Sequence, residues 1–399
     1  MPLTLIFDGD RPLAPLTDLR PVYRIRTGVM TTIERWRSVL KAPIDAVWPA
    51  ERLLALEREV AKVAVRPDLS GQSDVLLLNG ACVLPPSVQG LALGEWIACE
   101  RGTLLAARLS GADALGVLES GHRPDRSPAS VAHNAPCLAR ACDIIRLRDE
   151  AMEIDLHHCA SHDAGDIPAA VHRLGSNPVV LSDGCDVGPG VVLDASDGPV
   201  YIAPHARVRP HATLIGPCAV LEGATVLDGA LIRAHTVIGP HCKAAGEIGG
   251  TIFQGYANKG HDGYLGDAYV GEWVNLGAGT NNSNLLNTYG VVKAAAHLGA
   301  EREPTGLTFF GCVLGDHAKT AIGSRLMTGT LVGTGAMCAA TPPPPSVTDR
   351  FLWLTDSGAS RYRWSKFEEV ARAVMARRDV APSDAYLDTL RSLHGGDAS

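Results

Sequence analysis

A six-residue period in the middle of the chain constrains the fold more than any other feature. Aliphatic residues recur at every sixth position, and from the second one onward each follows a small residue two positions earlier. These aliphatic residues are Ile202, Val208, Leu214, Val220, Val226, Ile232 and Ile238. An α-helix repeats about every 3.6 residues and a flat strand about every 2, so neither produces this period. A coil of three short strands does, and stacked hexapeptide coils are typical of a parallel β-helix.

The same pattern returns later in the chain. Its inward positions there are Val270, Leu276, Leu314, Thr320, Leu326 and Val332. Glycines crowd the stretch 243–263, and a second interruption spans roughly 281–313. We interpret both as loops that leave the coil, where binding groups are commonly mounted. The proline run at 342–345 cannot join a strand ladder and is expected to end the solenoid.

The regions before and after the repeat have other sequence patterns. In the first 175 residues, apolar strand candidates alternate with helical stretches, which favours a mixed α/β domain with a largely parallel sheet. Beyond the prolines, apolar residues at helical spacing predict a helix over 364–375, and Ser383 is a good cap for a second one. We therefore predict domains at 1–175 and 176–341, followed by a proline-rich linker and helical tail at 342–399.

Composition narrows the class of protein. The 399 residues are 46% hydrophobic and 20% charged, so a large core can form. A net charge of −7 argues against nucleic-acid and anionic-membrane partners. No apolar stretch reaches the roughly 20 residues needed to cross a bilayer, and the N-terminus lacks the features of a signal peptide. The ten cysteines contain no Cys-x-x-Cys pair, so we expect a reduced, cytoplasmic protein.

The densest polar group of residues lies at 258–267 and 275–284. It includes His261 with glycines on both sides at one of the interruptions of the repeat. Imidazole titrates near ~6.5, so such a histidine is a candidate general base. The competing interpretation is an ordinary hydrogen-bonded histidine on the surface.

These stretches also carry a family resemblance. Lys259–Ala268 and Asn275–Thr280 resemble the acetyltransferase half of the bifunctional enzyme that makes UDP-N-acetylglucosamine. That family joins a glucosamine-1-phosphate N-acetyltransferase, on a left-handed β-helix, to an N-acetylglucosamine-1-phosphate uridylyltransferase. Gly271–Asn284, Pro15–Val22 and Thr27–Thr31 resemble an alternative bacterial branch described as sugar nucleotidyltransferases. The resemblance implies an N-terminal nucleotidyltransferase-like α/β domain, a left-handed parallel β-helix and a homotrimer with active sites between neighbouring β-helices.

The resemblance also assigns roles to individual residues. His261 falls on the general base, which takes a proton from the sugar amine as the nitrogen attacks the thioester of acetyl-CoA. The substrate-binding positions fall on Arg233, Tyr264, Asn275 and Asn284, and the coenzyme-binding positions on Ala278 and Ser324.

One departure concerns the phosphate of the substrate. The paired lysines that precede the base in the relatives have no counterpart, because the matching stretch is Glu247–Thr251. Phosphate binding then falls to another lysine, with Lys243, Lys259 and Lys293 as candidates.

The N-terminal region departs further. A nucleotidyltransferase needs a glycine-rich loop for the triphosphate and carboxylates for Mg²⁺. The chain has Asp8-Gly9-Asp10-Arg11 with no closely spaced glycines, and Leu78–Ala81 lacks the expected carboxylate. The remaining candidates for nucleotide binding are Arg20, Arg24, Arg26 and Asn79, with Asp155 as a candidate ligand for Mg²⁺. The arginines could equally be solvated loop charges.

Two groups of histidines do not predict metal sites. His157, His158 and His162, with Asp155, Asp163 and Asp166, lack firm ligand spacing. His205, His211, His235 and His241 lie within the repeat. With about 18 residues per coil from three six-residue repeats, His205 stacks on Gly223 and His235 on Pro217, so adjacent coils bring no histidines together.

We therefore expect an acyl-CoA-dependent N-acyltransferase, acting on an amino sugar phosphate or nucleotide amino sugar, joined to a sugar-1-phosphate nucleotidyltransferase-like domain. One alternative is a nucleotidyltransferase whose β-helix serves mainly for trimerisation. A second is a sugar-nucleotide-binding scaffold without catalysis.

Overall fold

The computed structural model describes residues 2–9, 11–121, 123–124, 127–132, 136–159 and 165–395. Asp10, His162 and Asp163 lie outside these ranges. The chain divides into two compact units. Unit 1 comprises Met1–Pro12, Leu19–Ile25 and Met30–Ala139, and unit 2 comprises Leu13–Asp18, Arg26–Val29 and Arg140–Ser399.

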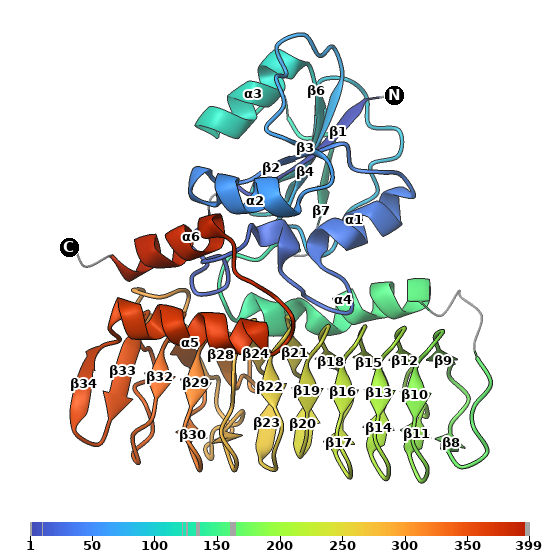
Figure 1. The fold of residues 1–399 in the computed structure, drawn as a ribbon. Coiled ribbons are helices and arrows are strands. Elements are labelled where there is room, and N and C mark those ends of the chain that lie inside the picture. Colours follow the sequence, from blue (N-terminus) through green and yellow to red (C-terminus); the bar gives the residue numbers. More distant parts are fainter. Residues whose placement is uncertain are drawn as a thin grey trace. The chain divides into compact units, whose positions relative to one another are not determined.

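Unit 1 is a mixed α/β fold around one seven-stranded sheet (Figure 1). The strand order is β3-β2-β1-β4-β6-β5-β7, and the first four strands are parallel to one another. Their bounds are β1 Leu3–Phe7, β2 Ala46–Trp48, β3 Ala64–Val65, β4 Val75–Asn79, β5 Glu95–Cys99, β6 Leu104–Leu109 and β7 Ser130–Ala132. The helices are η1 Val22–Arg24, α1 Thr32–Leu40, η2 Glu51–Leu53, α2 Leu54–Val60 and α3 Gly111–Ser120.

Local sequence explains these elements. β1 and β4 are apolar and almost wholly buried, as central strands of a covered parallel sheet require. α1 begins with a reciprocal capping box between Thr31 and Glu34, and Ser110 caps α3 through the backbone N–H of Asp113. The predicted mixed α/β class is confirmed.

Unit 2 is a parallel β-helix with three faces, and Figure 1 shows its short strands side by side. Face 1 consists of β10 Asp186–Val187, β13 Arg207–Val208, β16 Thr225–Val226, β19 Lys243–Ala244, β22 Asn258–Lys259, β29 Lys319–Thr320, β32 Met337–Cys338 and β33 Leu352–Thr355. Face 2 consists of β8 His172–Leu174, β11 Val192–Asp194, β14 Thr213–Ile215, β17 Leu231–Ile232, β20 Glu247–Gly249 and β23 Tyr264–Gly266, followed by the pair β25 Asn281–Asn282 and β30 Arg325–Leu326. Face 3 consists of β9 Val179–Leu181, β12 Val200–Ile202, β15 Cys218–Val220, β18 Thr236–Ile238, β21 Ile252–Phe253, β24 Tyr269–Val270, β28 Cys312–Leu314 and β31 Thr330–Val332.

The six-residue period sets the register. Ile202, Val220 and Ile238 lie opposite one another on face 3, so a regular coil takes eighteen residues. All seven aliphatic positions of the first repeat block are buried in one core, together with the small residues that precede them. The predicted parallel β-helix is confirmed.

The repeat does break over 243–263, but the external loop predicted there is wrong. No loop leaves the coil over 243–263, because β22 pairs with β19 and β23 pairs with β20 in parallel. The coil is only shortened: Ile232 lies opposite Ile248, sixteen residues later. Gly246 and Gly250 have φ of 74° and 56° and turn the chain within this shorter coil.

The second interruption does leave the coil. After β24 the chain still passes through Asn275 on face 1 and β25 on face 2. Between β25 and β28 it makes an excursion that includes the antiparallel hairpin β26 Lys293–Ala295 and β27 Arg302–Pro304. The proline run at 342–345, expected to end the solenoid, interrupts it only briefly. β33 follows the prolines, pairs with β32 in parallel and forms a hairpin with β34 Gly358–Arg361.

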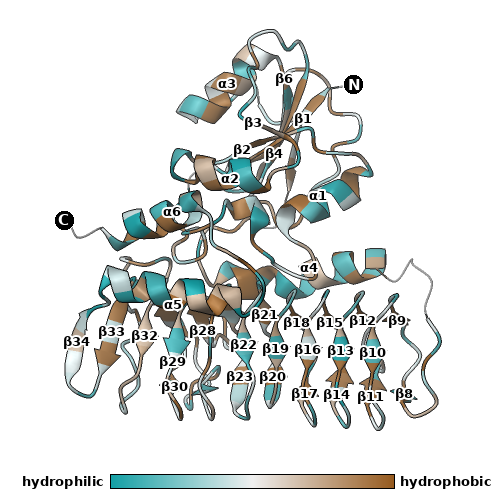
Figure 2. Cartoon of the chain, in the orientation of Figure 1, coloured by the Kyte–Doolittle hydropathy of each residue, from teal (hydrophilic) through white to brown (hydrophobic). Residues whose placement is uncertain are grey.

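Three helices pack within unit 2. Met152 and Leu156 of α4 (Asp143–Cys159) pack against Ala219 and Val237 on the outer side of face 3. Figure 2 shows α5 (Trp364–Ala376) with both hydrophobic and hydrophilic residues along its length, as expected of a helix on a surface. α6 (Asp384–His394) is capped by Ser383 and ends at Gly395, so the predicted helical tail is confirmed. No helix in the described ranges is long and apolar enough to span a membrane.

Candidate functional site

His261 lies at the corner between faces 1 and 2. The chain leaves β22 at Lys259, turns through 260–263 and enters β23 at Tyr264. In the next coil, Gly279 N–H donates to the carbonyl of Asp262 at 3.0 Å, and one coil further Gly323 N–H donates to the carbonyl of Ala278 at 2.7 Å. These corners therefore stack, and His261, Ala278 and Gly323 lie along one edge of the solenoid.

The side chain of His261 is exposed. Among the described residues, no hydrogen-bond partner of its imidazole is present, so both ring nitrogens can reach a ligand. The corner itself is fixed by backbone packing: a Cβ on Gly263, whose φ is 128°, would lie 2.3 Å from the carbonyl oxygen of Thr280. Only glycine fits there.

Lys259 holds this corner from inside the solenoid. The register places it in the same inward column as Val226 and Ala244, and it is 2% exposed. Its Nζ donates to the carbonyl oxygens of Ala245 at 2.8 Å and of His261 at 3.0 Å. Burial lowers the pKa of Lys259 to about 8. The ammonium is thus engaged with backbone, and its predicted contact with a substrate phosphate stays a prediction.

Tyr264 lies on face 2 next to the corner. Its hydroxyl oxygen accepts from Nδ2 of Asn284 at 3.0 Å, and the same amide donates to Asp267 at 2.7 Å. Asp267 also accepts from Nη1 of Arg148 on α4 at 2.8 Å. Burial raises the pKa of Tyr264, and nearby Asp267 acts in the same direction. The hydroxyl is therefore neutral and held in place, with its own proton left to donate to a ligand.

The asparagine-rich stretch after β24 has a structural explanation. Asn281 Oδ1 accepts from the backbone N–H of Tyr264 at 2.7 Å. Asn282 accepts from Gly266 N–H at 2.7 Å and donates to Gly266 C=O at 2.8 Å. These amides complete the ladder along β23, so the stretch that contains Asn284 also fixes the strand that carries Tyr264.

Arg233 lies on face 2 in a column with two glycines. A Cβ on Gly249 would lie 3.3 Å from the Cβ of Arg233, and Gly249 lies opposite Gly266. Nη1 of Arg233 binds Glu247 at 2.7 Å in an exposed ion pair. Glu247 is part of the stretch that replaces the relatives' lysines. The positive charge of Arg233 is therefore already paired on this face.

Asn275 belongs to face 1. Its Oδ1 accepts from Nδ2 of Asn258 at 2.8 Å, and it lines a cavity of about 400 Å³ that we call the face-1 cavity.

Two other predicted site residues lie elsewhere in unit 2. Lys293 is exposed on the hairpin of the excursion. Ser324 is 6% exposed and donates to the carbonyl of Ala321 at 2.9 Å.

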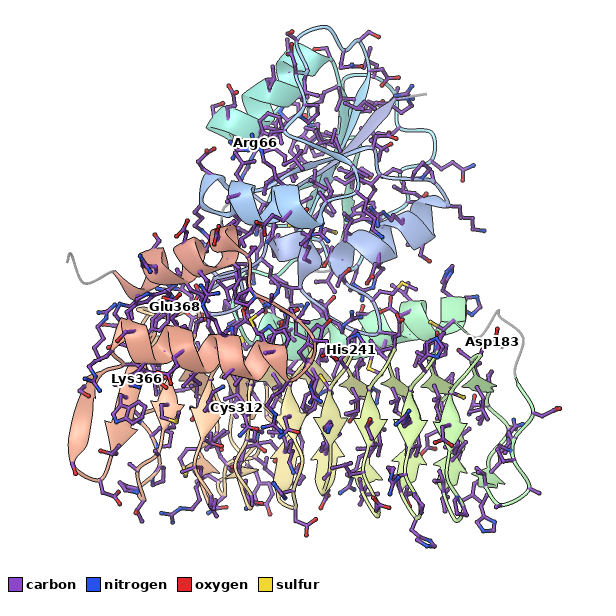
Figure 3. All side chains as sticks on the ribbon, in the orientation of Figure 1. Arg66, Asp183, His241, Cys312, Lys366 and Glu368 are labelled. Atoms are coloured by element: carbon purple, nitrogen blue, oxygen red, sulfur yellow. The ribbon has the colours of Figure 1, made fainter. Side chains whose placement is uncertain are left out.

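Unit 1 has its own cavity, of about 530 Å³, which we call the unit-1 cavity. Its polar lining includes Arg11, Glu51, Arg66, Glu119 and Arg123. The guanidinium of Arg66, labelled in Figure 3, lies 5.4 Å from the ring centre of Trp48 and forms an ion pair with Glu51. Three arginines around one hollow can bind phosphate groups.

The predicted nucleotide-binding residues are placed differently. Asn79 lines the unit-1 cavity, but its amide is occupied by Leu104 C=O at 2.6 Å and Ala81 N–H at 2.9 Å. Arg24 forms a bidentate pair with buried Glu57 at 2.6 and 2.7 Å. The two others are buried, Arg20 in unit 1 and Arg26 in unit 2. Their binding roles stay predictions.

The metal-ligand candidates do not form a site. Asp155 is fully buried on α4 and belongs to unit 2. Asp8, at the end of β1, accepts from the backbone N–H of Val22 at 2.6 Å and of Ala50 at 3.3 Å. No group of three or more His, Cys, Asp or Glu in the described ranges is arranged to hold a metal ion. The role of Asp155 as a ligand for Mg²⁺ therefore stays a prediction.

Several residues of the site could not be singled out from the sequence. Asp267, Asn281 and Asn282 are conspicuous in the polar stretch, but their roles depend on which strand they face. Arg148 and Lys319 are distant in sequence from the residues that they approach, and they carry no local signal.

Comparison with known proteins supports the relation indicated by the motifs. Residues 4–163 match the sugar nucleotidyl transferase family. The bifunctional protein GlmU of a Nostoc species is 30% identical over 165 residues, which cover 40% of this chain and 34% of that protein. GlmU of Trichormus variabilis is 28% identical over 181 residues, covering 40% and 39%. The chain thus spans little more than a third of these relatives' length. Its predicted likeness to this bifunctional family is confirmed.

The chain also matches the solved structure of a presumed acetyltransferase from Bacillus cereus. The match covers 53% of this chain and 99% of that one, with 10% identity and a TM-score of 0.17. This similarity is too low to support a statement about the fold.

Proposed function

We propose that this protein is a transferase of nucleotide-sugar synthesis. In unit 2, an acyl group passes from acetyl-CoA to the amine of an amino sugar phosphate or nucleotide amino sugar. The stacked edge of His261, Ala278 and Gly323 carries the proposal, because it presents an imidazole without a hydrogen-bond partner among the described residues. Tyr264 follows three residues later on β23, and its neutral hydroxyl is held by Asn284. Acetyl-CoA would lie along this edge, which continues to Ser324.

The chemistry needs little more than a base and a rigid frame. His261 takes the proton from the amine as the nitrogen attacks the acyl carbon, so that an N–C bond forms and the C–S bond breaks. The imidazolium then gives its proton to the leaving thiolate. Tyr264 donates to a sugar oxygen, and Asn284 keeps that hydroxyl in position. The frame is rigid because the solenoid corners stack on one another.

Thiol release tests this proposal. Purified protein with acetyl-CoA and glucosamine-1-phosphate should release free thiol, and His261→Ala should reduce the rate by at least about 10²-fold, the usual contribution of a general base. Because His261 is exposed, the variant should keep the melting temperature of the wild type. Full activity in His261→Ala would contradict the role.

For unit 1 we propose a sugar-1-phosphate nucleotidyltransferase site at the unit-1 cavity. The family match over residues 4–163 and the three arginines of this cavity support it. Pyrophosphate release from a nucleoside triphosphate and a sugar-1-phosphate should fall at least about tenfold in Arg66→Gln, since a charge-assisted contact is lost. Arg58→Gln, on α2 and outside the cavity lining, is the matched control. Nucleotide binding without release would favour a scaffold.

Two further proposals concern the cellular compartment and the oligomeric state of the protein. All ten cysteines are free thiols, which fits a reducing compartment such as the cytoplasm. We also propose a homotrimer, since the described part of the excursion and its neighbouring coils bears large exposed apolar side chains.

A further inference from the structure

The face-1 cavity is strongly basic. It lies on the outer side of face 1, against the end of α5, and is lined by Lys243, Lys319, Arg377 and Arg378. No acidic side chain lines it. The chain as a whole has a net charge of −7, so a group of four cations around one cavity is opposite in sign to the charge of the whole protein. A cavity of about 400 Å³ is large enough for a small metabolite.

Glu222 and Glu272 lie near Tyr256 in the lining of the cavity, but the four cations are not paired with them. None of the four forms an ion pair with any described residue. Lys319 reaches only the backbone oxygen of Trp273, at 3.5 Å, and burial lowers its pKa to about 8. Lys319 and Arg378 are half-buried, whereas Lys243 and Arg377 are exposed. An anion in the cavity would be attracted by all four charges.

The β-helix register fixes the floor of the cavity. Lys243 lies opposite Asn258, Asn258 opposite Asn275, and Asn275 opposite Lys319. Adjacent strands are about 4.8 Å apart, so the two lysines lie about 14 Å apart along the face with two amide side chains between them. This row offers hydrogen-bond donors at its centre and positive charge at both ends.

A stack of rings forms one wall. Tyr256 lies 4.8 Å from His241 and 4.3 Å from Trp273, measured between ring centroids, at the corner between faces 3 and 1. Figure 3 labels His241 on the solenoid, with Lys366 and Glu368 on α5. Arg377 and Arg378 follow the last turn of that helix. The two arginines therefore line the cavity from the end of α5.

The cavity lies close to the proposed catalytic corner. Asn258 precedes His261 by three residues, a separation of at most about 10 Å in extended chain. On the other side of that corner, Arg233 is already paired with Glu247, and Lys259 is engaged with backbone oxygens. Among the described residues, the face-1 cavity therefore brings together four cations without ion pairs around Asn258, on the strand that leads to His261.

We propose that the face-1 cavity binds the phosphate group of the acyl acceptor. This inference rests on the proposed function for the identity of the ligand, and it relocates phosphate recognition from face 2 to face 1. Lys319, Arg377 and Arg378 bind the phosphate oxygens, and the paired amides of Asn258 and Asn275 orient the sugar. The phosphates of coenzyme A are a second source of the same chemistry, but the whole pantetheine arm separates them from the thioester.

Calorimetric titration without an acyl donor tests the inference. Wild-type protein should bind glucosamine-1-phosphate at least tenfold more tightly than glucosamine. Arg377→Gln/Arg378→Gln and, separately, Lys319→Gln should abolish this preference. Arg372→Gln is the matched control, because Arg372 lies on α5 but pairs with Glu368 outside the cavity lining. Melting curves establish that each variant is folded.

The outcomes separate the inference from the proposed function. Phosphate-selective binding that the variants lose, with no acyl transfer in any mixture, would keep the inference and end the proposed acyltransferase. Acyl transfer whose kcat/KM for the acceptor is unchanged in Arg377→Gln/Arg378→Gln would overturn the inference alone. So would wild-type protein that binds neither glucosamine-1-phosphate nor inorganic phosphate. A variant that loses only the preference for coenzyme A over 3′-dephospho-coenzyme A would assign the cavity to the donor and overturn the inference.

Discussion

Lys259 is the residue at which a charged side chain enters the apolar inward column of face 1. In the coils before it, the same inward column is filled by Val226 and Ala244. A lysine in such a column keeps its stem in the core and must find oxygens for its ammonium, which here are backbone carbonyls at the His261 corner. The sequence pattern marks this position as an exception, but the exception has a structural cause only once the register is known.

Replacing Lys259 by methionine should separate its structural and functional effects. Methionine fits the inward position of Lys259, but the carbonyl of His261 loses its hydrogen bond from the ammonium. We therefore expect acyl transfer to fall at least tenfold with the fold retained. Lys259→Arg, which keeps a charge but not the geometry, is the comparison variant. Transfer at the wild-type rate in Lys259→Met would show that this hydrogen bond is irrelevant to the reaction.

The pH dependence of stability gives a second readout for the same residue. The pKa of Lys259 is lowered from 10.5 to about 8, so between these values the unfolded chain binds more protons than the folded one. Stability attributable to this group therefore rises with pH across that window and is flat below about 8. Subtracting the unfolding free energy of Lys259→Met from that of the wild type should show this rise. A flat difference curve would contradict a buried, titrating Lys259.

At the scale of elements, α4 connects the outer surface of the solenoid to Tyr264. Arg148 of α4 binds the carbonyl of Gly250 at 2.5 Å and Asp267 at 2.8 Å, and Asp267 positions the amide of Asn284. Breaking a largely buried pair on one side leaves the other charge without its partner.

Arg148→Met should therefore destabilise the protein by roughly 3 kcal/mol and also reduce acyl transfer. Adding Asp267→Asn should recover much of the stability, because the uncompensated carboxylate is removed. A double-mutant cycle of unfolding free energies measures the coupling. Additive effects would show that the two side chains do not act as a pair.

The elements show which features a sequence can reveal. Strict six-residue periodicity predicts the coils and their inward residues, and the cap at Ser383 predicts the start of α6. The shortened coil over 243–263 could not be predicted, because the glycines that turn it look like those of an external loop. Arg377 and Arg378 look like ordinary charges at a helix end, and only long-range packing places them over the face-1 cavity.

Long-range anchors are equally invisible in the sequence. Asp18 lies in a stretch that resembles nucleotidyltransferases, yet it forms a bidentate pair with Arg350 at 2.7 and 2.8 Å and accepts from Thr334 at 2.6 Å. A carboxylate in the stretch that carries the resemblance thus helps to hold unit 2 together.

At the scale of the whole molecule, exposed apolar residues indicate where a second copy would pack. Among the described residues, half of the large exposed hydrophobic side chains fall between 289 and 327, and Ile322 is the most exposed at 83%. Ile322 adjoins Gly323 on the edge that carries His261. If copies of the chain meet at this edge, assembly and acyl transfer depend on the same surface.

Ile322→Asp should test both together, because a charge cannot be buried unpaired in an apolar interface. We expect light scattering to show a fall from three chain masses to the single-chain mass of 42.0 kDa, with loss of acyl transfer and little change in the fold of each chain. Leu174→Asp is the control, since Leu174 is 50% exposed on β8, far along the solenoid from this edge. A monomer that keeps full transfer would place the whole acyl-transfer site within one chain, and an unchanged trimer would place the interface elsewhere.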